Sequence, residues 1–305
     1  MNFFYCRTVF QVYLASELIK RKNLENVFFL YIPNGSLSNK EKTILDGLIG
    51  NYEVMSSDNS LFRLILQALF LRKLKEKIKA HNSNIYFASI DDLYLRTIIS
   101  KISFNLIYTF DDGTVNYLSK SMYYLDKKYS KSISCKYYLL GNRIKTLDEI
   151  KKKITKHYSV TKFKNIIENV EYLPLFEPTL NQNNSKRVRV FLCPFYDELY
   201  LNPVVAREKL EKLLLKDDIV FCHPRDKNAV RNSKNDLLIT ERYISNLLSD
   251  GYAVDLFGTA NSTQFIFAFD SNVNNVVLDL GNVTEFFKDA FEEQVLILKN
   301  IEIKK

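Results

Sequence analysis

The chain has 305 residues, a formal net charge of +8, and 47% hydrophobic against 26% charged residues. This is ordinary globular composition, so it excludes a wholly disordered chain, and the length favours two domains. The positive charge favours anionic partners, which include nucleic acid, a phospholipid surface, a nucleotide or a phosphorylated glycan. A lysine-rich solvated surface explains the charge equally well, because the lysines are spread along the chain.

Apolar strand-like runs alternate with helical patterns along the first half of the chain. Strands are predicted at 2–8, 27–33, 84–90 and 105–110, and helices at 9–22, near 38–49 and at 91–102. Continuous apolar strands separated by helices predict βαβ units and a parallel sheet that is covered on both faces. We therefore assign residues 1–175 to an α/β, Rossmann-like domain.

Residues 61–79 form the most apolar helical pattern, and that pattern ends in a strongly basic stretch. The first interpretation is a helix that packs on the core and has a charged end. The alternative is a helix that lies on an anionic membrane surface. No uncharged run is long enough to span a bilayer, and the N-terminus lacks the basic region of a signal peptide.

The alternation restarts after a segment rich in proline, asparagine and serine, which predicts a linker at 176–187. Further strands are predicted at 188–194, 218–224, 252–258 and 275–280, with helices at 203–216, at 240–250 and from about 261. Residues 188–305 are therefore expected to form a second Rossmann-like domain. Two such units predict a cleft between them, with ligands at the carboxyl ends of the strands.

Several familiar sites are excluded by the residues that are missing. The four cysteines show no CxxC spacing, which argues against a zinc site or a disulfide scaffold and indicates a reducing compartment. The glycine-rich fingerprints of dinucleotide-binding and phosphate-binding loops are absent as well.

In the first domain, polar residues follow the strand at 105–110. Asp111 and Asp112 come directly after it and are followed by Gly113. One of the carboxylates could accept a proton or a sugar hydroxyl, and the glycine would allow close approach of the backbone. The alternative is an Asp-Gly turn that caps the next helix.

In the second domain, Asp197 and His223 follow the first two strands. Asp197 is a candidate base, or else an ordinary acid in the first turn of a helix. His223 could donate or accept a proton near neutral pH, although a lone histidine is more often structural. Pro224 ends the strand ladder. Arg225 either binds an anion or braces the loop.

A further group of residues precedes the helix that starts near 261. It comprises Gly258, Thr259, Asn261, Ser262 and Thr263. Hydroxyls and free backbone N–H groups at a helix N-terminus can bind an anion, whereas capping by Asn261 or Ser262 is the ordinary alternative. Glu241 could bind a ribose hydroxyl pair, although glutamate is also favoured at any helix N-terminus.

A base, an acid and an anion-binding helix start, without a metal motif, outline a metal-independent glycosyltransferase whose leaving group bears a single phosphate. Six segments also resemble, in the same order, the bacterial lipooligosaccharide sialyltransferases of glycosyltransferase family 52. They are FFYCRTVFQVYLASELI (3–19), YTFDDGTVNYL (108–118), YLPLF (172–176), VRVFLCPFYDE (188–198), CHPRD (222–226) and LFGTANS (256–262). The resemblance spans nearly the whole chain.

The resemblance implies a GT-B fold and inverting transfer of sialic acid from CMP-sialic acid to a terminal galactose. The acceptor would be a bacterial lipooligosaccharide or capsule, the linkage α-2,3, and neither a metal nor a cofactor would be needed. Asp197 then matches the catalytic base and His223 the acid. Asp112 is the alternative base, because the corresponding acid serves as base in a related family. Asp111 and Gly113 belong to the acceptor side.

Donor binding is expected of one set of residues, namely Pro224, Arg225, Glu241, Gly258, Thr259, Asn261, Ser262 and Thr263. Two other functions remain open at this point. One is a family relative that uses another nucleotide sugar, such as a hexosyltransferase, and the other is a non-catalytic basic protein that binds nucleic acid or a membrane surface. We expect no nucleic-acid partner and a cytoplasmic location. Contact with the inner face of the plasma membrane and a homodimer are left open.

Overall fold

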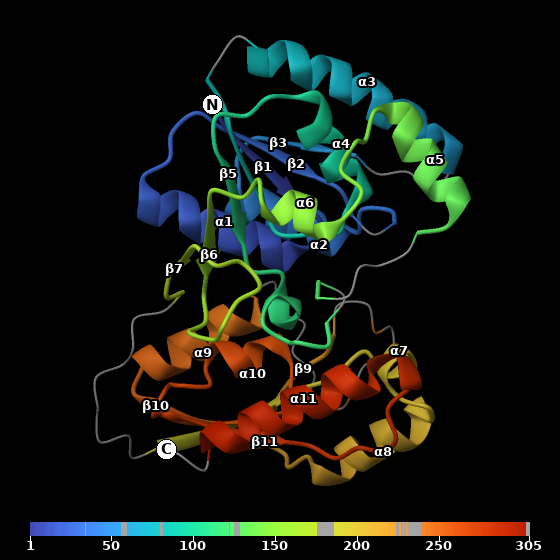
Figure 1. Cartoon of the computed structure of the whole chain (residues 1–305). Coiled ribbons are helices and arrows are strands. Elements are labelled where there is room, and N and C mark those ends of the chain that lie inside the picture. The colour runs from blue at the N-terminus through green and yellow to red at the C-terminus, as the bar shows by residue number, and fades with distance from the viewer. Residues whose placement is uncertain are drawn as a thin grey trace. The chain divides into compact units, whose positions relative to one another are not determined.

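A computed structural model of the chain describes residues 1–33, 35–55, 60–79, 82–121, 123–124, 129–175, 186–223, 226, 228, 230 and 239–302. The chain divides into two compact units. The first comprises Met1–Tyr117 and Ser121–Leu175, and the second comprises Leu118–Lys120 and Phe176–Lys305. Each unit contains one parallel β-sheet with helices packed against it (Figure 1).

The first unit is built on a seven-stranded sheet in the order β3-β2-β1-β4-β5-β6-β7, and every neighbouring pair is parallel. The strands are β1 (Asn2–Cys6), β2 (Val27–Tyr31), β3 (Tyr52–Val54), β4 (Asn84–Phe87), β5 (Ile107–Phe110), β6 (Lys156–Ser159) and β7 (Val170–Tyr172). The predicted strands of this unit are confirmed. The first three end two or three residues earlier than predicted, and the freed residues form loops at the carboxyl edge.

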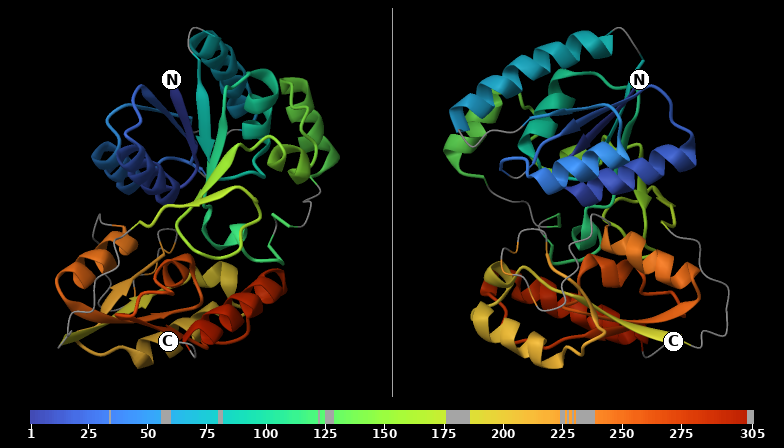
Figure 2. Two further views of the ribbon diagram at one scale, coloured as in Figure 1. Left: turned by 60° about the vertical axis from the view of Figure 1, so that its left-hand side comes forward. Right: turned by 180° about the vertical axis from the view of Figure 1, so that it is seen from behind.

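Helices cover both faces of this sheet. They are α1 (Val9–Lys22), α2 (Asn39–Leu48), α3 (Ser60–Lys79), α4 (Leu93–Lys101), α5 (Lys131–Leu140) and α6 (Leu147–Lys151), with a 3₁₀ turn, η1, at Gly113–Asn116. Helices α1 and α2 lie on one face, whereas α3, α4 and α5 lie on the other (Figure 2). None of the helices in the described part of the chain is long and apolar enough to cross a membrane.

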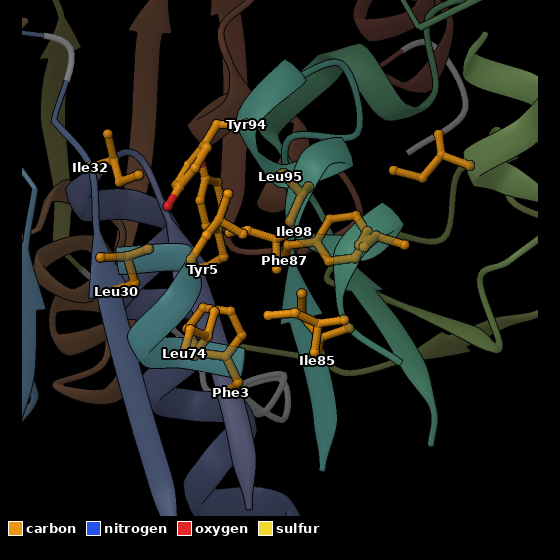
Figure 3. Packing of buried hydrophobic residues seen from close by; sticks show 14 of the residues in the cluster. Phe3, Tyr5, Leu30, Ile32, Leu74, Ile85, Phe87, Tyr94, Leu95 and Ile98 are labelled. Carbon is orange, nitrogen blue, oxygen red and sulfur yellow. The ribbon is translucent and has the colours of Figure 1, made fainter. Parts of the chain in front are cut away.

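The core of the first unit follows from the alternation of side chains along the strands. Phe3 and Tyr5 of β1 and Phe87 of β4 point to the α3 and α4 face, where they pack with Leu74 and Tyr94 (Figure 3). The intervening strand residues form a stacked aromatic row on the opposite face. This row contains Phe4, Phe29, Tyr86 and Tyr108, with successive ring centroids 4.5–5.0 Å apart. Because both faces are buried, each strand reads as an unbroken apolar run.

The second unit has a four-stranded parallel sheet in the order β11-β10-β8-β9. Its elements are β8 (Lys186–Leu192), α7 (Tyr196–Leu199), α8 (Pro203–Leu213), β9 (Ile219–Phe221), α9 (Thr240–Ser249), β10 (Tyr252–Gly258), α10 (Ser262–Ile266), β11 (Val273–Val277) and α11 (Glu285–Glu302). Lys186 and Arg187, which the sequence placed in the linker, pair with Tyr252 and Ala253 and already belong to β8. Their exposed basic side chains concealed the start of this strand.

Candidate active site

Asp112 lies at the carboxyl edge of the first sheet, directly after β5, and three side chains hold its carboxylate. Gln11 Nε2 donates to Oδ1 at 2.6 Å, and Ser89 Oγ donates to Oδ2 at 3.0 Å. The Tyr123 hydroxyl also donates to Oδ2. Gln11 follows β1 and Ser89 follows β4, so the parallel order β1-β4-β5 brings these residues together. The donors fix the orientation of Asp112 and occupy both of its oxygens.

A second carboxylate, Asp92, anchors the same edge. It forms an ion pair with Arg7, and it accepts hydrogen bonds from the Tyr5 hydroxyl at 2.9 Å and from Leu95 N at 2.8 Å. The Arg7 backbone N–H donates to Gln11 Oε1 at 2.7 Å, so Gln11 connects the Arg7 loop with the Asp112 carboxylate. Burial and the neighbouring Asp92 raise the pKa of Tyr5 well above its ordinary value, which keeps the phenol neutral as a donor.

Asp111, which the sequence placed on the acceptor side, is buried and hydrogen-bonded within the first unit. It is 1% exposed and accepts hydrogen bonds from Ser159 Oγ at 2.9 Å and from Val160 N at 2.7 Å. His157 Nε2 lies 2.9 Å from its Oδ1, and His157 Nδ1 lies 2.8 Å from Thr109 Oγ1. A carboxylate only accepts, so Nε2 donates to Asp111. Asp111 therefore joins β5 to β6 inside the domain, and a role on the acceptor side stays a prediction.

Gly113 begins the 3₁₀ turn with φ of +69°, a conformation that glycine adopts without strain. The Asp112 backbone N–H donates to Asn116 Oδ1 at 2.7 Å within the same turn. An Asp-Gly turn is therefore present, but the Asp112 side chain makes no capping hydrogen bond to the 3₁₀ turn, as the alternative would require. The turn sets the direction in which the chain leaves β5.

In the second unit, Asp197 and His223 follow adjacent strands. Strands β8 and β9 are paired in parallel, and Cys193 N donates to Phe221 O at 2.8 Å just beyond β8. The His223 ring stacks on the Phe195 ring with centroids 5.6 Å apart and an interplanar angle of 26°. Asp197 lies two residues further on, exposed in the first turn of α7. An imidazole and a carboxylate are thus presented by neighbouring segments.

The loop after His223 is held by Arg207, which the sequence analysis missed. Arg207 Nη2 donates to Asp226 Oδ1 at 3.1 Å, and its guanidinium lies over the Tyr196 ring at 4.3 Å. The Asp226 backbone N–H in turn donates to His223 O at 2.9 Å. Arg207 therefore links the chain on both sides of the candidate pair. Pro224 and Arg225 lie outside the described residues.

Glu241, predicted to bind a ribose, is 5% exposed in the first turn of α9. Its Oε1 accepts from Thr263 Oγ1 at 2.6 Å, which ties α9 to α10. Burial raises the pKa of Glu241 above its ordinary value of 4.5, and the Thr263 hydroxyl opposes this shift by stabilising the carboxylate. One oxygen of this carboxylate is thus already in use within the domain.

The loop from β10 to α10 is shaped around Gln264. Its Oε1 accepts from Ala260 N at 2.8 Å and from Asn261 N at 3.3 Å, while Asn261 Oδ1 accepts from Gln264 N at 3.1 Å. A Cβ atom at Gly258 would lie 2.6 Å from Gln264 Oε1, so a side chain there would displace this amide. Asn261 therefore caps the helix, as the ordinary alternative required. Thr259 is 4% exposed beside it.

Within the described residues, no three His, Cys, Asp or Glu side chains converge in an arrangement that could hold a metal ion. Metal independence stays a prediction, since a substrate can supply ligands of its own.

Comparisons with known proteins agree with this architecture. The family model described as glycosyltransferase family 52 matches residues 26–281. A CMP-N-acetylneuraminate:beta-galactoside alpha-2,3-sialyltransferase of Pasteurella multocida is 28% identical over 80% of this chain and 80% of its own length. An N-acetyllactosaminide alpha-2,3-sialyltransferase of Haemophilus influenzae is 28% identical over 93% of this chain and 90% of its own length.

Among solved structures, a sialyltransferase from Photobacterium damsela superposes with a TM-score of 0.50 at 11% identity. The match covers 99% of this chain and 79% of that chain. It confirms the predicted α/β fold of the GT-B type. Because the family model matches most of the chain, this protein belongs to glycosyltransferase family 52.

Proposed function

We propose that this glycosyltransferase is an inverting sialyltransferase. It would move sialic acid from CMP-sialic acid to the terminal galactose of a bacterial lipooligosaccharide or capsule, with an α-2,3 linkage. The names of both curated relatives support this donor sugar and linkage. The observation that carries the proposal is the stacking of His223 on Phe195, because it places the imidazole beside the short segment that leads to Asp197.

In the proposed reaction, a galactose hydroxyl oxygen attacks the anomeric carbon of sialic acid from the face opposite the phosphate. Asp197 takes the hydroxyl proton as the new carbon–oxygen bond forms. The bond from the anomeric carbon to the phosphate oxygen breaks, and His223 gives a proton to the phosphate of the departing CMP. A single displacement through an oxocarbenium-like transition state inverts the anomeric carbon. Each proton transfer contributes about 10²–10⁴-fold to the rate.

Asp197 is the better candidate for the base on the evidence of hydrogen bonding. Both oxygens of Asp112 already accept from Gln11, Ser89 or Tyr123, whereas Asp197 is exposed at the start of a helical turn. A base needs an open oxygen within hydrogen-bond reach of the proton that it removes. We assign Asp112 to holding the carboxyl edge of the first sheet, where it can orient acceptor hydroxyls.

The donor nucleotide is proposed to lie at the carboxyl edge of the second sheet. CMP leaves as a phosphate monoester with one anionic centre, which a histidine proton and nearby hydroxyls can stabilise without a metal. Ser262 supplies such a hydroxyl at the start of α10, whereas the Thr263 hydroxyl donates to Glu241. The residues that remain predicted donor contacts are Pro224, Arg225, Gly258, Thr259, Asn261 and Thr263. We place this activity in the cytoplasm, because cysteines without CxxC spacing suit a reducing compartment.

Nucleotide selectivity tests the proposal directly. Thermal denaturation is measured with CMP, CDP, UDP and GDP, in EDTA because no metal is invoked. CMP is expected to raise Tm, since a ligand at 100 times its Kd adds about 2.7 kcal/mol to the unfolding free energy. Product analysis with CMP-sialic acid and a panel of galactosides then identifies the acceptor and linkage. Stabilisation by UDP but not CMP would instead identify a hexosyltransferase and contradict the sialyl assignment.

Glu241→Gln tests whether Glu241 holds Thr263 or binds the donor. The glutamine Oε1 can still accept from Thr263, but it does not titrate. Because burial raises the folded-state pKa of Glu241, wild-type stability falls as pH rises from about 4.5 through that pKa. The variant is therefore expected to be as stable as wild type near pH 4.5 and progressively more stable above it. Urea denaturation across this range measures the difference.

The Kd for CMP separates the two roles of Glu241. A residue that only positions Thr263 leaves that Kd within about twofold in Glu241→Gln, because the hydrogen bond is retained. A loss of CMP affinity by more than tenfold would show that the carboxylate binds the nucleotide itself, as the sequence suggested.

A further inference from the structure

Helix α5 leaves most of its side chains exposed, including apolar ones. None of the side chains along Lys131–Leu140 is buried, and Ile133, Tyr138 and Leu139 are exposed, Leu139 at 78%. A short helix gains most of its stability from packing an apolar face against a neighbour. The side chains of α5 therefore indicate a further surface that covers them.

Helix α3 presents a matching stripe. Phe62, Ile65 and Leu69 are spaced i, i+3 and i+7, which places them on one side of the helix, and all three are at least half exposed. The opposite side packs Leu71, Leu74 and others into the core, so the helix is anchored in the domain. The exposed stripe is therefore separate from the side of α3 that packs into the core.

The two helices lie beside one another on the same face of the first sheet (Figure 1). Tyr137 of α5 packs against the same core cluster as Leu71 and Leu74 of α3. We call the exposed apolar residues of both helices the α3–α5 surface. It consists of Phe62, Ile65, Leu69, Ile133, Tyr138 and Leu139.

Positive charge is concentrated on these helices. Helix α3 carries six basic residues and one acidic residue, and α5 carries two basic residues and no acidic one. Their net charge is +7, against +8 for the whole chain. The basic residues Arg72, Lys73, Lys75 and Lys77 are exposed in the C-terminal half of α3. Exposed apolar and basic side chains thus both occur along α3.

We propose that the α3–α5 surface binds the anionic headgroup layer of a lipid bilayer. The apolar side chains enter the boundary between headgroups and acyl chains, and the basic side chains contact lipid phosphates. A second copy of this chain is a poorer partner, because it would bring a second charge of +7 against the first. Nucleic acid would match the charge but would leave the aliphatic side chains of α3 in water.

Flotation with lipid vesicles tests this proposal on the full chain. The protein is expected to float with vesicles of phosphatidylethanolamine and phosphatidylglycerol, and much less with phosphatidylcholine alone. Raising the salt concentration should weaken the binding, because salt screens contacts with anionic lipid. Leu69→Ser and Leu139→Ser should each weaken it about five- to tenfold by removing inserted methyl and methylene groups. Lys75→Gln should weaken it about fivefold by removing one contact with the anionic surface.

Matched variants on the second unit serve as controls. Leu69 is 62% exposed and Leu296 of α11 is 61% exposed, so Leu296→Ser removes equal apolar surface elsewhere. Lys299→Gln is the matching control for charge, since Lys299 is also exposed. Both controls should bind vesicles like wild type.

Three results would overturn the proposal. The first is equal loss of flotation in the α3–α5 variants and in the controls. The second is a wild-type dimer that Leu69→Ser or Leu139→Ser converts to a monomer, measured by light scattering. The third is tight binding of an RNA oligonucleotide without flotation.

Discussion

His223→Ala is expected to lower kcat for sialyl transfer by about 10²–10⁴-fold, the contribution typical of a general acid. Without the imidazole, the departing CMP phosphate has no positioned proton donor, and its developing charge is left to the surrounding hydroxyls. The fold should persist, because His223 is partly exposed and its ring stacks on Phe195. Steady-state kinetics with CMP-sialic acid and a galactoside give kcat, and thermal denaturation with CMP reports fold and donor binding.

A second substitution at the same position distinguishes proton transfer from hydrogen bonding. The side chain of His223→Gln can donate a hydrogen bond to the phosphate but cannot transfer a proton. If His223 acts as an acid, this variant should be nearly as slow as His223→Ala. Recovery of most of the activity with glutamine would reduce the role to hydrogen bonding, and wild-type rates with alanine would remove His223 from the mechanism.

The sheets were predictable because parallel strands buried on both faces have an unmistakable composition. Runs such as VFFLY in β2 and VFL in β8 contain little else than apolar residues. Strand β6 was not predicted, because KHYS is short and largely polar. Its buried His157 is accommodated by a hydrogen bond to Asp111, which the sequence does not show. Helix α5 escaped because it buries no side chain and therefore shows no clear apolar periodicity.

Candidate site residues could be predicted only where a polar side chain comes directly after a buried strand. Asp112, Asp197 and His223 each come shortly after a buried run, which is the position where parallel sheets place ligands. Gln11 acts on Asp112 from 101 residues away, so nothing local in the sequence marks it.

The Asp111–Asp112 pair shows a second limit of sequence reasoning. Successive side chains at a strand end point in opposite directions, so one acid faces inward and the other outward. The sequence does not reveal which of the two acids faces inward. Hydrogen bonds from Ser159 and Val160 identify Asp111 as the inward one.

Asp197→Ala is expected to affect mainly kcat, whereas Asp112→Ala is expected to affect mainly stability and the KM for the acceptor. Asp197→Ala should lower kcat by about 10²–10⁴-fold as the base is lost. Its unfolding free energy should stay within about 0.5 kcal/mol of wild type, because Asp197 is exposed. Asp112→Ala strips the acceptor from Gln11, Ser89 and Tyr123, and donors left unpaired cost about 1–3 kcal/mol. Its effect should therefore be largest on stability and on the KM for the acceptor.

Formate provides the decisive comparison, because a small carboxylate can occupy the space vacated by a missing base. It should restore part of the kcat of Asp197→Ala, where the site is open to solvent, and leave Asp112→Ala unchanged. Glu208→Ala, which removes an exposed acid from α8, controls for the loss of surface charge. Rescue of Asp112→Ala instead, together with a near-normal rate in Asp197→Ala, would transfer the base to the first unit. The three hydrogen bonds now assigned to holding Asp112 would then have to rearrange when the acceptor binds.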